Sequence, residues 1–129
     1  GEALSNIVRT AIILKDSYNN VMVVQRGKKS TGEWSLVGKE MKGKEDPEKC
    51  ITKAGYKDID CAIFDLEPFG EYIINEAAGE KLMVFTGVIR QYIVVHKSIN
   101  QVKWINKAQL EELQFSPVEK QALIDFFNK

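Results

Sequence analysis

The sequence predicts an α/β protein in which helices pack on a mixed β-sheet. Two observations lead to this prediction. Runs of β-branched and aromatic residues recur between polar turns, which is typical of strands. Capping residues followed by an amphipathic pattern occur once in the middle of the chain and twice near its end, which is typical of helices. Because strands come before and after the first helix, a sheet covered by helices is the natural architecture.

Two strands are predicted near the N-terminus, at Ile7–Leu14 and Val21–Arg26. The turn-forming residues 16–20 lie between them, so the two strands are predicted to form a hairpin. The polar and basic segment 27–32 is predicted to be a flexible loop, which leads into a short strand at 33–37.

A glycine-containing turn over residues 38–44 is predicted to precede the first helix. Asp46 or Glu45 can cap that helix, and Pro47 fits its first turn, where no backbone N–H is needed. Gly55 is predicted to weaken or end the helix, because glycine costs about 1 kcal/mol relative to alanine there. A short helix is therefore expected, with a narrow apolar stripe formed by Cys50, Ile51 and Ala54.

The second half of the chain is predicted to be mainly extended. Its extended segments are 61–66, 68–74, 82–90 and 101–105. Across the turn 75–80, residues 70–74 and 82–88 are predicted to pair as a long hairpin. Residues 92–95 either continue that ribbon or start a bend.

Two helices are predicted to end the chain. Asn106 can cap the first, over residues 107–113. Ser116 and Glu119 form a capping box for the second, with Pro117 in the first helical position. The apolar face of this last helix consists of Val118, Ala122, Leu123, Phe126 and Phe127.

Composition and charge exclude several classes of protein. The 129 residues, 44% of them hydrophobic, are typical of one soluble globular domain. Eighteen basic and eighteen acidic residues cancel, so broad binding to nucleic acid or to a membrane is not expected, although a local basic patch is compatible with this balance. The chain has no apolar run of membrane-spanning length and no secretory pattern, so a cytoplasmic protein is expected, with Cys50 and Cys61 reduced and buried.

The order of these elements and several local motifs resemble the Nudix superfamily. The first two strands look like a hairpin of that family, which ends in an arginine, here Arg26. Residues 32–38, GEWSLVG, resemble the G-x-W-x-L-P-G lead-in of the family, with Val37 in place of proline. The C-terminal part of the chain also resembles the family, through Trp104, Ile105, Leu110, Leu113, Phe115 and Pro117. The resemblance implies a Nudix-type α/β/α sandwich with a central mixed β-sheet, formed by a single domain over residues 1–129.

The Nudix box, which is the family's signature, is degenerate in this chain. The box reads glycine, five residues, glutamate, seven residues and then R-E-U-x-E-E-x-G-U, where U is aliphatic. Its helical glutamates share one face and hold Mg²⁺ or Mn²⁺ for hydrolysis of a nucleoside diphosphate linked to another group. Glu45 is kept here, but the glycines become Lys39 and Asp60, and the metal-holding positions become Ala54, Lys57 and Asp58. A lysine in this cluster repels a divalent cation, so weak or absent hydrolysis is expected.

The resemblance also identifies candidate site residues. The basic residues expected to contact phosphate are Arg9, Arg26, Lys39, Lys53 and Lys57. Glu45 and Asp58 are the candidates for residual metal binding and, together with Glu71, for catalysis, because loop carboxylates supply the general base in some Nudix enzymes. Alternatively, the acidic residues only complement the helix dipole on a solvated face, and the lysines are only surface residues.

Three functions are compatible with the sequence. The first, which the sequence favours, is a Nudix-like domain that binds a nucleotide or nucleotide-sugar ligand with weak or no hydrolysis. The second is an active pyrophosphohydrolase whose Mg²⁺ or Mn²⁺ is held by non-standard carboxylates; no other cofactor is expected. The third is a protein-interaction module, and a homodimer or a protein partner is compatible with it. The identity of the ligand and membership of a longer chain stay open.

Overall fold

The computed structural model describes residues 6–27 and 32–129, so most of the predicted loop 27–32 lies outside the described residues. The strands are β1 (Ile7–Leu14), β2 (Val21–Arg26), β3 (Glu33–Trp34), β4 (Val37–Glu40), β5 (Phe64–Asn75), β6 (Glu80–Val88), β7 (Ile99–Ile105) and β8 (Gln114–Phe115). The helices are α1 (Pro47–Ile59), α2 (Lys107–Leu110) and α3 (Pro117–Phe127). None of these described helices is long and apolar enough to cross a membrane.

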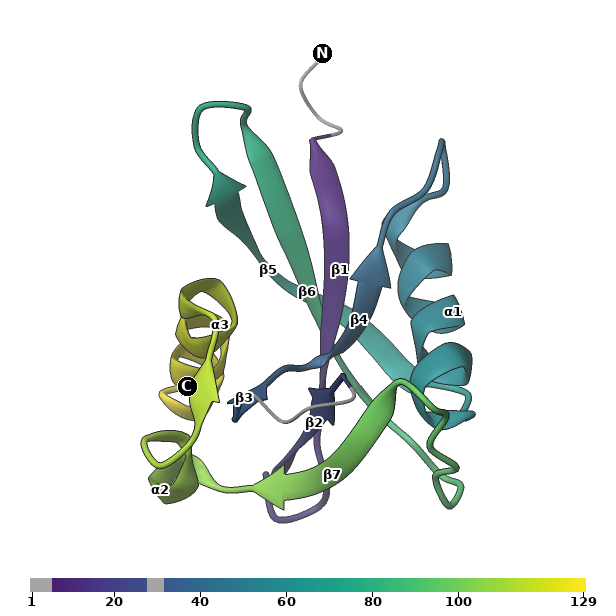
Figure 1. Ribbon diagram of the computed structural model, residues 1–129, viewed down its shortest axis with the longest axis vertical. Helices are drawn as coiled ribbons and strands as arrows, with labels where there is room; N and C mark the ends of the chain where they lie inside the picture. The colour runs from purple at the N-terminus through teal and green to yellow at the C-terminus, as the bar shows by residue number, and fades with distance from the viewer. Residues whose placement is uncertain (1–5, 28–31) are drawn as a thin grey trace.

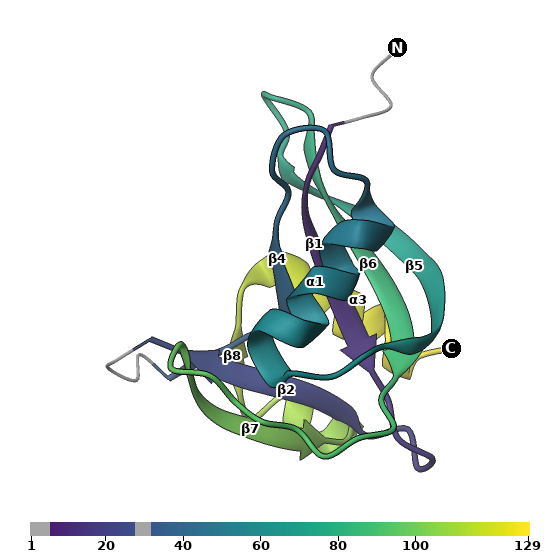
Figure 2. The same cartoon turned by 90° about the vertical axis from the view of Figure 1, so that its right-hand side faces the viewer.

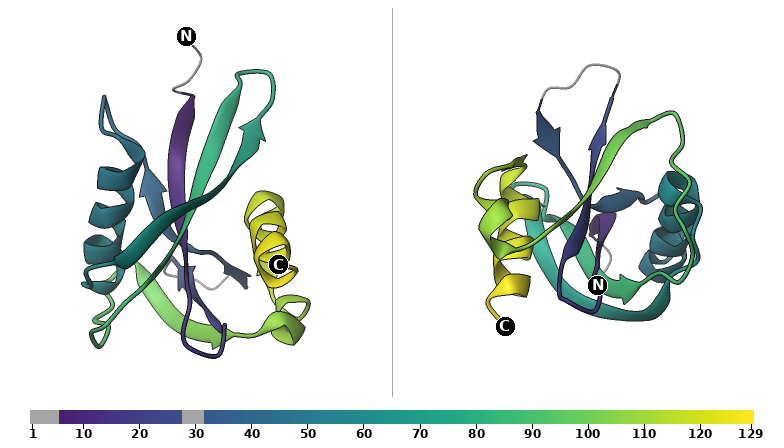
Figure 3. Two further views of the ribbon diagram at one scale, coloured as in Figure 1. Left: turned by 180° about the vertical axis from the view of Figure 1, so that it is seen from behind. Right: turned by 90° about the horizontal axis from the view of Figure 1, so that it is seen from below.

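The centre of the molecule is a mixed sheet with the strand order β4-β1-β6-β5. β1 runs parallel to β6 and antiparallel to β4, and β5 runs antiparallel to β6. Helix α1 lies on one side of this sheet and α3 on the other, as Figure 1 and the view from behind in Figure 3 show. The predicted α/β/α sandwich with a central mixed sheet is therefore confirmed.

β1 separates two hydrophobic cores, because alternate side chains of a strand point to opposite faces of the sheet. Ile12 and Leu14 belong to the core under α1, whereas Ala11 and Ile13 belong to the core that contains Leu123 of α3. All four β1 side chains are buried. A strand that is apolar on both faces is stable only inside a sheet with both faces covered.

The predicted hairpin of β1 and β2 is not formed. β1 lies between β4 and β6, and β2 pairs instead with β7, from Val21 opposite Ile105 to Arg26 opposite Ile99. Among the described residues, only an isolated bridge between Lys15 and Val21 joins the two segments. The prediction was wrong because β1 is a central strand, and both of its edges pair with strands from distant parts of the chain while both of its faces are buried in the cores.

In place of the predicted strand 33–37 and turn 38–44, the structure has two short strands, β3 and β4. The chain forms β3, leaves it at Ser35, and then forms β4, which includes Gly38. Ser35 exchanges two backbone hydrogen bonds of 2.8 Å with β2, which interrupts the predicted strand. A Cβ at residue 38 would overlap the backbone carbonyl of Thr10, so Gly38 allows β4 to approach β1 closely and does not make a turn.

Helix α1 begins as predicted. Asp46 has an extended backbone and its carboxylate accepts a hydrogen bond of 2.9 Å from the backbone N–H of Lys49. Pro47 occupies the first helical turn. The N-terminus of α1 is thus determined by its own local sequence.

The end of α1 differs from the prediction, because the helix continues past Gly55 and is 13 residues long. A Cβ on Gly55 would lie 2.9 Å from the carbonyl oxygen of Cys61 and 3.0 Å from the side chain of Ile63. Glycine therefore allows the chain that leaves the helix to pack back against it. Asp60 ends the helix in the left-handed conformation, with φ of 57°, and its N–H donates to the carbonyl of Tyr56.

The second half of the chain largely follows the prediction. The two extended segments merge into β5, an edge strand that tolerates Pro68, and the hairpin with β6 is confirmed. Residues 92–95 form no strand, and α2 ends at Leu110. Ser116 caps α3, but the carboxylate of Glu119 accepts a hydrogen bond from the backbone N–H of Leu36, so the capping box is only half formed.

Candidate functional site

A cleft of about 380 Å³ lies where α1, β4 and the N-terminal strands meet. Figure 2 shows α1 lying across β4 and β1. Five basic and two acidic side chains line this basic cleft together with one glycine: Arg9, Arg26, Gly38, Lys39, Glu40, Lys42, Lys57 and Asp58. An excess of positive charge in a concave site favours an anionic ligand.

Asp58, a candidate metal ligand, is bound by an arginine. The Arg26 side chain donates to both oxygens of Asp58, from Nη1 at 3.0 Å and from Nη2 at 2.6 Å. The backbone N–H of Gly38 donates to the same carboxylate at 3.3 Å. The Asp58 side chain is 2% exposed, and Arg26 supplies the counter-charge that such burial requires.

Glu45, the second candidate metal ligand, is bound by two lysines. Its Oε2 lies 2.8 Å from Nζ of Lys53, and its Oε1 lies 3.1 Å from Nζ of Lys39. These hydrogen bonds, that of Lys53 foremost, lower the pKa of Glu45 from 4.5 to about 2. The same contact raises the pKa of the Lys53 ammonium. Glu45 is thus ionised and paired with cations of the protein.

The residues at these positions do not fit a Mg²⁺ or Mn²⁺ site. Glu45 and Asp58 already have cationic partners, whereas Ala54 brings no ligand and Lys57 brings a positive charge. Throughout the described part of the chain, no group of three or more histidine, cysteine, aspartate or glutamate side chains is arranged to hold a metal ion. Hard divalent cations require several oxygen ligands, which this donor set does not supply.

Two lysines of the basic cleft have no ion-pair partner among the described residues, and Arg9 has only a long ion pair. Lys42 and Lys57 form no ion pair within residues 6–27 and 32–129. The guanidinium of Arg9 is 36% exposed and lies 3.8 Å from Glu119, too far for a direct hydrogen bond. These side chains are the ones available to a phosphate group.

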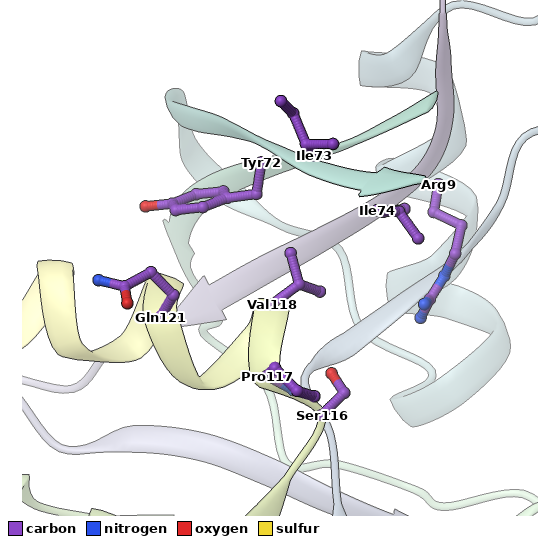
Figure 4. Close-up of a pocket in the computed structure, with 8 residues that line it drawn as sticks. All are labelled: Arg9, Tyr72, Ile73, Ile74, Ser116, Pro117, Val118 and Gln121. Atoms are coloured by element: carbon purple, nitrogen blue, oxygen red, sulfur yellow. The ribbon is translucent and has the colours of Figure 1, made fainter. Parts of the chain in front are cut away.

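A second hollow, of about 480 Å³, lies between β5 and the start of α3. Its lining residues, shown in Figure 4, are Arg9, Tyr72, Ile73, Ile74, Ser116, Pro117, Val118 and Gln121. Burial and a hydrogen bond of 2.8 Å to Asp125 raise the pKa of Tyr72, so its hydroxyl stays protonated and holds the ring in place. Arg9 lines both this apolar hollow and the basic cleft, which therefore adjoin.

Most of the candidate site residues lie together in the structure, but two of those predicted do not. Arg9, Arg26, Lys39, Lys57 and Asp58 all line the basic cleft. The other two candidates lie outside its lining. Lys53 binds Glu45 from the solvent side of α1, and Glu71 of β5 pairs with Lys81 at 3.4 Å.

The apolar hollow was not predicted from the sequence. Its walls come from β1, β5 and the first turns of α3, which are far apart in the chain. Tyr72 was recognisable only as one of several aromatic residues, since no spacing links it to residues 116–121. The sequence signal that points to this region is Arg9, a charge that interrupts an apolar strand.

Comparison with solved structures identifies the fold. A MutT protein from a study of Aliivibrio salmonicida and Vibrio cholerae matches with a TM-score of 0.76 at 14% identity, over 95% of this chain and 97% of that one. A Nudix hydrolase from Nitrosomonas europaea matches with a TM-score of 0.74 at 11% identity, over 95% and 88%. The E. coli dihydroneopterin triphosphate pyrophosphohydrolase matches with a TM-score of 0.68 at 14% identity, over 94% of each chain.

Sequence comparisons add no relative, since no family model and no curated protein matches the chain. The structural matches have low identity but span nearly the whole of both chains. These matches, together with the mixed sheet of this chain and its two flanking helices, lead to one conclusion. The chain has the Nudix fold.

Proposed function

We propose that this protein binds a nucleoside-diphosphate-type ligand with weak or no hydrolysis. The observation that carries the proposal is the positive charge of Lys42 and Lys57, which have no ion-pair partner among the described residues, beside the half-exposed Arg9 in a cleft that adjoins an apolar hollow. In this arrangement the diphosphate lies in the basic cleft and the nucleoside lies in the apolar hollow. Arg9 contacts the ligand at the junction.

The chemistry of the two hollows supports this division. Lysine is an effective point charge for phosphate, and arginine can bind two phosphate oxygens at once. The apolar hollow offers the ring of Tyr72 and the side chains of Ile74 and Val118 to a flat heterocycle. Ligand sites in proteins commonly combine such apolar walls with a few convergent polar groups.

The pairing of the carboxylates supports weak or no hydrolysis. Asp58 is bound by Arg26, and Glu45 is bound by Lys39 and Lys53, so neither is free to hold a metal or to activate water. Proteins with a similar fold are named hydrolases, one of them a pyrophosphohydrolase of a triphosphate. Those names support a ligand that contains a phosphate anhydride, and an assay for turnover separates binding from hydrolysis.

The test is a thermal-unfolding screen of ADP, ADP-ribose and UDP-glucose, each with EDTA, Mg²⁺ or Mn²⁺, with release of the nucleoside monophosphate, AMP or UMP, measured in parallel by chromatography. A ligand at a hundred times its Kd stabilises the protein by about 2.7 kcal/mol, which raises Tm by several degrees. We expect stabilisation that Lys57→Ala reduces and Lys49→Ala does not, because Lys49 is exposed on α1 and lines neither the basic cleft nor the apolar hollow.

The other outcomes distinguish the remaining functions. Metal-dependent release of product would replace this proposal with an active pyrophosphohydrolase. No stabilisation by any of the three ligands would contradict nucleotide binding and favour a protein-interaction module.

A further inference from the structure

Cations of the protein pair with Asp58, which lines the basic cleft, and with Glu45, which pairs with Lys39 of the cleft lining. Arg26 holds Asp58 through hydrogen bonds of 3.0 and 2.6 Å. The ammonium of Lys39 lies 3.1 Å from the Glu45 carboxylate and donates to the backbone carbonyl of Glu40 at 3.0 Å. The carboxylate oxygens of Asp58 and Glu45, which could otherwise bind a metal ion, are thus already paired with side chains of the protein. A divalent ion would have to displace these side chains.

The remaining charge of the cleft favours a ligand that brings no cation of its own. Lys57 and Lys42 have no ion-pair partner within residues 6–27 and 32–129, and both line the cleft. A diphosphate complexed with Mg²⁺ carries less negative charge than the free diphosphate. Its metal would also lie close to these ammonium groups, where like charges repel. The uncomplexed diphosphate meets only attraction from them.

We propose that the basic cleft selects the metal-free form of a diphosphate, so that Mg²⁺ weakens binding by converting the ligand into its complexed form. This inference rests on the proposed function, since it concerns the same cleft. It reverses the metal dependence that the resemblance to Nudix hydrolases implies. The chain's own arginine and lysines supply the positive charge that a metal supplies in a carboxylate-lined site.

The experiment is isothermal titration calorimetry of the full chain with ADP and with inorganic pyrophosphate. One buffer contains EDTA, and the others contain increasing MgCl₂, with NaCl adjusted to hold the ionic strength constant. We expect the apparent Kd for total ADP to rise about tenfold once most of the ADP is complexed, within the usual range of coupling between two ligands. Expressed as the concentration of uncomplexed ADP, the Kd is expected to stay constant.

The possible results separate this inference from the proposed function. Equal or tighter binding of ADP in MgCl₂ overturns selection of the metal-free form and leaves the proposed function in place. A Kd for uncomplexed ADP that changes with MgCl₂ shows that Mg²⁺ acts on the protein, which also overturns the inference. Absence of binding by ADP and by pyrophosphate in every buffer overturns both.

A pair of lysine variants tests whether the diphosphate binds in the basic cleft. Lys57→Met is expected to weaken binding of pyrophosphate in EDTA about tenfold, because it removes one charged hydrogen-bond donor. Lys49→Met, on the exposed face of the same helix, is expected to bind as the wild type does. Thermal unfolding verifies that both variants fold. Unchanged affinity in a folded Lys57→Met overturns the assignment to this cleft.

Discussion

At the scale of single residues, Asp58 is the clearest case of a candidate metal ligand that has become structural. It accepts two hydrogen bonds from Arg26 and one from the backbone of Gly38. Asp58→Ala is expected to lower the free energy of unfolding by about 2 kcal/mol. Solvent recovers part of the loss, since the Arg26 side chain is 35% exposed. Urea unfolding in EDTA measures this change.

If Asp58 were instead part of a metal-binding cluster of carboxylates, its removal would raise the free energy of unfolding in EDTA. Removing one member of a repulsive acidic cluster stabilises the protein when no metal is bound. An Asp58→Ala variant at least as stable as the wild type in EDTA would therefore contradict the structural role. Asp58→Asn keeps one oxygen acceptor and is expected to be destabilised less than Asp58→Ala.

Glu45 makes the stability of the protein depend on acid pH. Its pKa falls from 4.5 in the unfolded chain to about 2 in the fold, so its contribution is complete above pH 4.5 and is lost as the pH falls towards about 2. The difference in Tm between the wild type and Glu45→Gln is expected to be constant above that window and to shrink within it. Thermal unfolding from pH 7 to pH 2 tests this, and a difference that does not change with pH would contradict it.

At the scale of elements, α1 contains a glycine that packing requires. Alanine normally stabilises a helix by about 1 kcal/mol relative to glycine. In α1, a Cβ on Gly55 would lie 2.9 Å from the carbonyl oxygen of Cys61. Because this oxygen belongs to the backbone, the contact is relieved only if the backbone shifts. Gly55→Ala is therefore expected to destabilise the protein by about 1–2 kcal/mol.

The control for this prediction lies on the same helix. Thr52 is exposed, and its hydroxyl donates a hydrogen bond of 2.8 Å to the carbonyl of Glu48 in its own helix. Thr52→Ala is expected to leave the stability unchanged or slightly raised, as helix propensity dictates. Chemical denaturation compares both variants with the wild type. Stabilisation by Gly55→Ala would show that the neighbouring chain moves easily.

At the scale of the whole molecule, Glu119 joins α3 to the segment between β3 and β4. Its carboxylate accepts a hydrogen bond of 2.7 Å from the backbone N–H of Leu36, 83 residues away in sequence. It also accepts one of 3.2 Å from the hydroxyl of Ser116 and lies 3.8 Å from Arg9. Glu119 is 4% exposed, so water cannot readily replace these contacts.

Loss of this junction is expected to destabilise the entire fold. Glu119→Ala leaves the buried N–H of Leu36 without an acceptor, which costs about 2–3 kcal/mol. Glu119→Gln keeps an acceptor oxygen and is expected to lose less than half as much. Urea unfolding monitored by fluorescence follows the change, because Trp34 is buried near this junction. Equal losses in the two variants would mean that the charge, and not the hydrogen bond to Leu36, is what stabilises the protein.

Much of the fold was predictable, because its signals are local. Asp46, Asn106 and Ser116 accept hydrogen bonds from backbone groups three residues later, so neighbours in sequence determine where each helix starts. The hairpin of β5 and β6 depends on a turn between adjacent segments, and it was predicted for the same reason. These local signals, together with the order of strands and helices, already favoured a mixed sheet with helices packed on it.

The sequence by itself determined the types of element and the helix N-termini. Only the tertiary structure decided which strands flank β1, that Gly55 serves packing and not helix termination, and that Arg26 neutralises Asp58 from 32 residues away. The reason is physical. A cap or a turn is completed by the residues beside it, whereas a strand partner or a buried ion pair is chosen by burial and charge neutralisation across the whole chain.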